Sequence, residues 1–221
     1  MGKAEQSDER LAELVRISKQ IEGLTTSLLY AYRKEHGYEP VIGQGDSRAR
    51  IMFIGEAPGE AEAKSGQPFC GRSGRVLDEL LASIGLPREG VYITNIVKDR
   101  PPKNRDPLPA EIALYAPFLD RQIEVIKPKV IATLGRFSME YIMGRYGLKD
   151  KIQPISKAHG DTFTTAFAYG EVIIIPLYHP AVALYDPKQK AVLIKDFKKV
   201  KKAGKWISCP MDLNPEAFLL S

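Results

Sequence analysis

Cysteine and histidine are scarce in this sequence: its 221 residues include two cysteines and three histidines. The two cysteines, Cys70 and Cys209, are too few for a disulfide framework, and no CxxC pair or Cys/His spacing typical of zinc occurs. The sequence also lacks an apolar run of about 18 residues and a signal-peptide pattern at its N-terminus. These absences predict a cytoplasmic protein with no membrane partner.

The composition describes an ordinary globular chain with a mildly basic balance. Hydrophobic residues make up 44% of the sequence, which is enough for one sizeable core, so a single domain is expected. The formal net charge is +5 and the isoelectric point is near 9.1. This balance permits a nucleic-acid partner without requiring one, because many basic enzymes bind no nucleic acid.

Alternating patterns of strand and helix predict an α/β fold. Four apolar runs rich in β-branched residues are predicted to be strands, at residues 49–55, 91–97, 129–134 and 171–177. Amphipathic patterns predict helices at residues 75–84, 109–126, 136–146 and around 189–202. Strands that alternate with helices form a parallel sheet covered on both faces.

The two ends and one polar stretch fall outside this alternation. Residues 1–38 are expected to form a helical segment packed on the core, with Ser7 as a helix cap. Its apolar face combines Leu11, Leu14, Ile17, Ile21 and Leu24, and Val15 widens it. Residues 150–165 are predicted to be a loop or a weak hairpin, and residues 206–221 a C-terminal tail.

Polar and aromatic residues follow three of the predicted strands. Glu56, Glu62 and Phe69 lie in the long loop after the first strand, Asn95 near the end of the second, and His179 after the fourth. The carboxyl ends of parallel strands share one edge, where ligands are held, so these side chains can converge. Each residue also has a structural interpretation: the loop as a long connection, Phe69 as core, Asn95 as a brace, and His179 as a residue placed by the following proline.

Four segments carry a family resemblance, namely GEAPGEAEAKSGQPFCGRSG, YITNIVKDRPPKNRDPLPAEI, KPKVIATLGRF and YHPAVALYDP. They resemble motifs of the uracil-DNA glycosylases, most closely family 4, in order from about residue 40 to residue 200. The resemblance implies a three-layer α/β/α domain at residues 39–205 with a central four-stranded parallel sheet. It also implies hydrolysis of the N-glycosidic bond of uracil in DNA, the first step of base excision repair, in the bacterial or archaeal nucleoid.

The resemblance assigns roles to individual positions. Phe69 matches the aromatic residue that stacks on uracil, Asn95 the asparagine that reads the base edge, and His179 the histidine placed against uracil O2. The pair Glu56-Ala57 stands where other glycosylase families carry a catalytic Asp, Asn or Gln, and Gly55 and Ala57 belong to the predicted uracil-binding set. Glu62 matches an acidic residue on the same loop. Glu56 is the candidate for positioning the attacking water, with Glu62 as the alternative.

One family feature has no counterpart in this sequence. Family 4 members typically hold a [4Fe–4S] cluster with four cysteines, and such a cluster needs four thiolates. Two would fall within residues 27–38, one at Asp99 and one near Tyr115, and none of these positions is a cysteine. The cluster is therefore predicted to be absent, with no other cofactor, and aromatic packing by Tyr30, Tyr32 and Tyr115 is the expected substitute.

Candidate DNA contacts follow from basic residues near helix starts and loops. A helix N-terminus can hold a phosphate through its backbone N–H groups. The candidates are Arg72, Ser73, Arg75, Arg100, Lys103, Arg105, Arg136 and Ser138. Leu184 is the predicted wedge that fills the gap left by the flipped nucleotide, with Val182 as the fallback. The Lys-rich helix end at residues 195–205 is interpreted as a solvated face.

Three functions therefore remain open. The first is a monofunctional, monomeric uracil-DNA glycosylase that acts on single- or double-stranded DNA. The second is a relative that binds DNA lesions but hydrolyses poorly. The third is a glycosylase shifted to other deaminated bases, such as hypoxanthine or xanthine.

Overall fold

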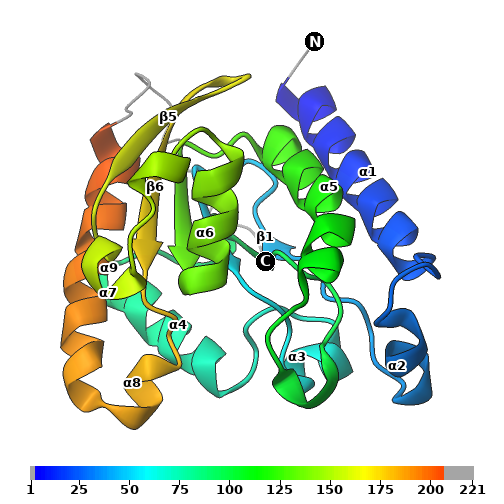
Figure 1. Ribbon diagram of the computed structural model, residues 1–221. Coiled ribbons are helices and arrows are strands. Elements are labelled where there is room, and N and C mark those ends of the chain that lie inside the picture. The colour runs from blue at the N-terminus through cyan, green and yellow to red at the C-terminus, as the bar shows by residue number, and fades with distance from the viewer. Residues whose placement is uncertain (1–2, 207–221) are drawn as a thin grey trace, which may run out of the picture.

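The computed structural model describes residues 3–206 of the protein (Figure 1). The predicted C-terminal tail lies outside these residues apart from Trp206, and Cys209 lies outside them too. Within the described range, no helix is both long and apolar enough to cross a membrane.

The described strands form one six-stranded sheet in the order β1-β3-β2-β4-β6-β5. Its centre is the predicted set of four parallel strands: β3 (Tyr92–Asn95), β2 (Ile51–Gly55), β4 (Val130–Leu134) and β6 (Gly170–Leu177). Two antiparallel edge strands, β1 (Gln44–Gly45) and β5 (Phe163–Phe167), extend it. The predicted four-stranded parallel core is thus confirmed. The sheet has two further strands at its edges, which were not predicted.

The edge strands escaped prediction for identifiable reasons. β1 is only two residues long, with both residues exposed, so it has no apolar run. β5 alternates half-buried and exposed residues, and it pairs with β6 as a hairpin across residues 168 and 169. The hairpin alternative for residues 150–165 therefore holds for their last part, while their first part contains the short helix α7 (Ile155–Ala158) and a 3₁₀ turn, Lys149–Lys151.

Helices cover both faces of the sheet. On one face lie α1 (Lys3–Glu22), α5 (Pro109–Ile126) and α6 (Arg136–Arg145), and on the other α4 (Arg72–Ser83) and α9 (Pro187–Trp206) (Figure 1). Aliphatic, methionine and aromatic side chains fill the first layer, and the second includes a stacked pair, Phe53 and Phe197, with ring centroids 5.5 Å apart. This is the expected α/β/α arrangement.

The N-terminal helix packs less completely than its sequence predicts. Leu14, Ile17 and Ile21 are buried, but Leu11 and Val15 are 58% and 45% exposed. The buried stripe is therefore narrower than the predicted apolar face. The helix begins at Lys3, so Ser7 lies inside it and does not cap it.

The carboxyl ends of the parallel strands lie level with one another. Gly55 is paired with Asn95 across β2 and β3, and Leu134 with Leu177 across β4 and β6. The short helices α2 (Tyr30–Glu35), α3 (Glu60–Ser65) and α8 (Val182–Tyr185) lie toward this end of the molecule (Figure 1). The remaining 3₁₀ turns are Arg88–Gly90 and Pro102–Asn104. All the predicted site residues belong to this end.

Candidate active site

A cavity of about 380 Å³ opens at the carboxyl ends of β2 and β3. Most of the predicted base-binding residues line it together: Glu56, Ala57, Glu62, Phe69, Asn95 and His179. Gly55 is buried directly beneath, at the end of β2. Residues far apart in the sequence therefore meet in one site, as the shared edge of a parallel sheet predicts.

Asn95 presents an unsatisfied acceptor in this cavity. The residue is 2% exposed, and its side-chain Oδ1 has no hydrogen-bond partner within the described residues. A buried polar atom without a partner costs free energy, and such atoms are rare in folded proteins. A ligand that donates a hydrogen bond at this point would satisfy it.

Lys98 fixes the backbone of Asn95 through a hydrogen bond to its carbonyl oxygen. Its Nζ donates to the backbone oxygen of Asn95 at 2.7 Å, to Thr94 Oγ1 at 2.7 Å and to Gln122 Oε1 at 2.6 Å. Burial lowers the pKa of Lys98, but three acceptors around one nitrogen match the three protons of an ammonium group. This fully buried side chain therefore fixes the end of β3. Sequence reasoning did not single it out, although it stands in the KDRPP motif.

Phe69 adopts a backbone conformation that is unusual for a non-glycine residue, with φ at 49°. Its carbonyl packs against Gly74, where a Cβ would overlap the carbonyl oxygen. Its ring reaches Gly55, where a Cβ would lie 2.7 Å from ring Cζ and would also collide with Asn95 Oδ1. Gly74 therefore leaves room for the Phe69 carbonyl and Gly55 for its ring. A strained backbone of this kind is typical of functional sites.

His179 is held as a neutral ring with a defined proton position. Burial lowers the pKa of His179 to about 4, and the nearby Glu62 carboxylate only partly opposes this. Its Nδ1 accepts a hydrogen bond from the backbone N–H of Ala181 at 3.2 Å. Because Nδ1 is the acceptor, the proton of the neutral ring lies on Nε2. The ring centroid is 5.8 Å from that of Phe69.

The two acidic residues of the cavity differ in their partners. Glu62 Oε1 accepts the N–H of Gly71, which begins α4, at 2.9 Å. The side-chain carboxyl group of Glu56 has no hydrogen-bond or ion-pair partner within residues 3–206, although its backbone oxygen accepts the N–H of Val97. Burial, with a smaller effect of the Asp106 carboxylate, raises the pKa of Glu56 to about 7, against the opposing charge of Arg136. Of the two carboxyl groups, that of Glu56 is the one available to a ligand or water.

Comparison with known proteins agrees with this geometry. The profile of the uracil DNA glycosylase superfamily matches residues 42–203. The chain belongs to this superfamily. Within it, the type-4 uracil-DNA glycosylase of Sulfurisphaera tokodaii is 47% identical over 163 residues, 73% of each chain. That of Thermotoga maritima is 37% identical over 195 residues, 87% of this chain and 94% of the relative.

A type-5 member of the superfamily is less similar. The type-5 uracil-DNA glycosylase of Thermus thermophilus is 34% identical over 140 residues, 56% of this chain and 64% of the relative. Identity and coverage are both lower than for the two type-4 relatives named above. The likeness to family 4 is thus confirmed. Within the described part of the chain, no group of three or more His, Cys, Asp or Glu residues could hold a metal ion.

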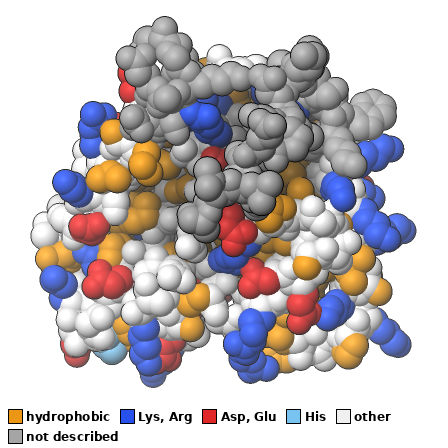
Figure 2. Space-filling view, turned by 180° about the vertical axis from the view of Figure 1, so that it is seen from behind, with side chains coloured by type: hydrophobic (Ala, Val, Ile, Leu, Met, Phe, Trp, Pro, Cys, Tyr) orange, Lys and Arg blue, Asp and Glu red, His pale blue; other side chains and the backbone are white. Residues whose placement is uncertain are grey.

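The candidate DNA contacts of this superfamily member fall into two groups. Arg72, Arg75, Lys103 and Arg136 have exposed side chains, and Ser73 lines the cavity. On the face turned away from the view of Figure 1, Lys and Arg are interspersed with Asp and Glu wherever described residues are visible (Figure 2).

Three other candidates are engaged inside the protein. Arg100 is 9% exposed and donates to Tyr38 and Asn104, while Arg105 forms two hydrogen bonds with the Glu111 carboxylate. Ser138 is buried and donates to the backbone oxygen of Gly135. Arg105 still lines the cavity, so it can meet a ligand there, whereas Arg100 and Ser138 do not line it.

The predicted wedge residues are only partly accessible. Val182 and Leu184 pack against the core that α4 and α9 cover. The next residue on α8, Tyr185, is 82% exposed. Sequence reasoning passed over this tyrosine, because an aromatic residue at helical spacing does not by itself reveal which way it points.

Proposed function

We propose that this protein is a monofunctional uracil-DNA glycosylase, a hydrolase that cleaves the N-glycosidic bond of uracil in DNA and leaves an abasic site. Membership of the superfamily and the names of its type-4 relatives support a DNA N-glycosylase. The observation that carries the proposal is the buried, unpartnered Oδ1 of Asn95 in a cavity shared with Phe69 and His179.

The cavity is suited to a uracil base that has been flipped out of the helix. Flipping costs a few kcal/mol in lost stacking and pairing, and stacking on an aromatic face such as Phe69 recovers roughly 1–3 kcal/mol. Asn95 Oδ1 accepts the N3–H of uracil, and its amide nitrogen donates to O4. Cytosine presents a bare N3 and an amino group at these positions, so a fixed amide would face mismatched groups.

Bond cleavage develops positive charge on the sugar and negative charge on the departing base. His179 is neutral and carries its proton on Nε2, which is the form that donates to an anionic O2. A donor placed where negative charge develops accelerates reactions by roughly 10²–10³-fold. The ring needs no proton transfer to act in this way, because a hydrogen bond to the anion is sufficient.

Water completes the reaction by attacking the sugar. Glu56 is the candidate for positioning that water, because it is partly buried, unpartnered and titrates near neutral pH. Glu62 is the weaker candidate, because one of its oxygens already holds the N–H of Gly71. No lysine lines the cavity within the described residues, which favours water over an amine as the nucleophile and so a monofunctional enzyme.

A second substrate class is supported by the same asparagine. Hypoxanthine and xanthine carry an N–H next to a carbonyl, as uracil does, so the Asn95 amide can pair with them in the same sense. Selectivity among deaminated bases then depends on the shape of the cavity. We therefore include these bases in the test of the proposal.

The test uses oligonucleotides that each contain one uracil, hypoxanthine, xanthine or thymine, with alkali to cleave abasic sites. Uracil is expected to be released, and Asn95→Ala and His179→Ala are each expected to slow single-turnover release by at least about tenfold while the fold is retained. Stoichiometric binding of uracil-containing DNA without turnover would instead identify a lesion-binding protein. Unchanged rates in both variants would place the site elsewhere.

A further inference from the structure

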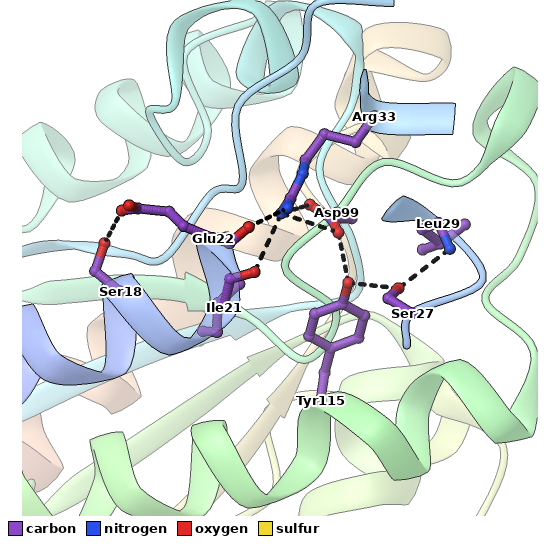
Figure 3. A network of polar contacts seen from close by, with 8 residues as sticks. All are labelled: Ser18, Ile21, Glu22, Ser27, Leu29, Arg33, Asp99 and Tyr115. Carbon is purple, nitrogen blue, oxygen red and sulfur yellow. Dashed lines mark hydrogen bonds and ion pairs between the residues drawn. The ribbon is translucent and has the colours of Figure 1, made fainter. Parts of the chain in front are cut away.

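The positions at which family 4 would carry its cluster cysteines meet in one buried network (Figure 3). The segment of residues 27–38 contributes Ser27 and Arg33, and the other two positions are Asp99 and Tyr115. All four side chains are at most 5% exposed. Their donor set is one carboxylate, two hydroxyls and a guanidinium, without a thiolate, so it does not fit an iron–sulfur cluster.

The network satisfies its polar groups internally. Arg33 Nη1 donates to Asp99 Oδ1 at 3.0 Å and to Oδ2 at 3.3 Å, and its other donors reach the backbone oxygens at the end of α1. Tyr115 donates its hydroxyl proton to Asp99 Oδ2 at 2.5 Å. Ser27 must therefore donate to Tyr115, at 2.8 Å. Hydrogen bonds and an ion pair thus join four separate parts of the chain.

Aromatic packing, the substitute expected from the sequence, contributes less than these polar contacts. Tyr115 is buried but acts through its hydroxyl group. Tyr30 lies under the Arg33 guanidinium, 4.9 Å from ring centroid to Cζ, and Tyr32 contacts His36 at the surface. The ion pair of Arg33 with Asp99 is the centre of the network.

Asp99 is also part of the loop that walls the cavity. The segment of residues 33–41 contacts three consecutive residues of that loop. The N–H of Val41 donates to the backbone oxygen of Lys98 at 2.7 Å, and Arg33 pairs with Asp99. Arg100 donates to the hydroxyl group of Tyr38 at 2.5 Å. Three of the next five residues, Pro101, Asn104 and Arg105, line the cavity.

The loop needs such support because its backbone is strained. Lys103 and Asn104 both have φ at 54°, in the left-handed region that non-glycine residues rarely occupy. Such conformations persist only where the surrounding structure holds them. Arg100 supplies one link, because its Nε donates to Asn104 Oδ1 at 2.8 Å.

We propose that the network of Arg33, Asp99 and Tyr115 stands in place of a metal cluster and positions the loop of residues 98–105 at the mouth of the base pocket. These three are positioning residues, since none of them lines the cavity. The part of this inference that concerns catalysis rests on the proposed glycosylase function. The part that concerns loop order does not.

The test compares Asp99→Asn, Tyr115→Phe and Arg33→Met with a matched control, Arg121→Met. Arg121 also links helices, through Glu13 and Gln20 of α1, but on the surface and away from the loop. In the network variants, amide hydrogen exchange of residues 98–105 is expected to accelerate by at least about tenfold, whereas the control leaves it unchanged. Tyr115→Phe removes one hydroxyl and is the variant to use if the others fail to fold.

Two further measurements complete the test. Wild-type protein produced with excess iron and purified without oxygen is expected to contain no stoichiometric iron and no visible absorbance. For the network variants, the concentration of uracil-containing DNA at half-maximal single-turnover rate is expected to rise by about tenfold, more than the limiting rate falls. Bound iron, or network variants that lose thermal stability while loop exchange stays at the wild-type rate, would overturn the proposal. A wild-type protein that releases no uracil would reject the proposed function alone, because the exchange experiment needs no turnover.

Discussion

Two acidic residues follow neighbouring strands of the same sheet, but the carboxyl group of one is paired inside the protein and that of the other is not. Asp99, after β3, is 1% exposed and is bonded to Arg33 and Tyr115. Glu56, after β2, is partly buried with no partner within the described residues, and burial raises its pKa to about 7. Burial also raises the pKa of Asp99, but the Tyr115 hydroxyl and the Arg33 charge oppose this. A paired carboxylate holds structure, and an unpaired one is available for chemistry.

The largest expected effect is on the free energy of unfolding, which should respond differently to removal of the Asp99 and Glu56 carboxyl groups. Asp99→Ala leaves the Arg33 charge buried and unpaired, and breaking a buried pair in this way typically costs about 3–5 kcal/mol. Glu56→Ala removes no side-chain hydrogen bond or ion pair and relieves the cost of burying that carboxyl group, so it is expected not to lower the free energy of unfolding at pH 6. Urea denaturation monitored by circular dichroism measures both. Equal losses in the two variants would remove the distinction.

The next effect concerns the rate of uracil release. Glu56→Gln is expected to slow single-turnover release by about 10–100-fold, because a positioned base is lost while the shape is kept. Glu62→Gln keeps an oxygen for the Gly71 N–H and is expected to stay within about threefold of the wild type. If Glu62→Gln is the slower variant, the water is positioned by Glu62 and the assignment of the two acids is reversed.

The raised pKa of Glu56 predicts a pH dependence with opposite signs for rate and stability. The rate is expected to rise with pH through about 7 and then level off, since the carboxylate is the active form and His179, with a pKa of about 4, stays neutral. The folded state holds the Glu56 proton more tightly than the unfolded state, so stability should fall as pH rises from about 4.5 to about 7. Both trends should be absent in Glu56→Gln, as rate profiles and denaturation at several pH values can show.

The smallest effect concerns the surface beside the site. Tyr185→Ala is expected to reduce release from a U·A pair a few-fold, less from a U·G mismatch and least from single-stranded DNA, because only a stable stack needs to be held open. Leu184→Ala is the comparison, since that side chain packs partly on the core. If Leu184→Ala follows this order of substrates and Tyr185→Ala does not, the wedge is Leu184, as its sequence position first suggested.

The parts of the fold that could be predicted from the sequence are those with a local pattern. The four parallel strands are buried on both faces, so they appear as continuous apolar runs, and α5 was predicted at its observed bounds, Pro109–Ile126. The exposed Leu11 and the two edge strands were not predictable, because burial of a half-apolar segment depends on what packs against it. For the same reason Leu184 was a better wedge candidate in the sequence than it is in the fold.

The sequence by itself determined the alternation of strands and helices along the chain and the cluster of polar residues at the strands' carboxyl ends, because parallel strands bring Glu56, Asn95 and His179 to one edge. Only the tertiary structure decided the protonation states and hydrogen-bond partners of those residues. The proton on His179 Nε2, the elevated pKa of Glu56 and the Lys98 hydrogen bonds beneath Asn95 depend on burial and on neighbours from other elements. Arg33 and Asp99 lie 66 positions apart, and no local pattern could have paired them. Removing water from each charge is costly, and the fold compensates that cost by bringing the opposite charges and the Tyr115 hydroxyl into contact.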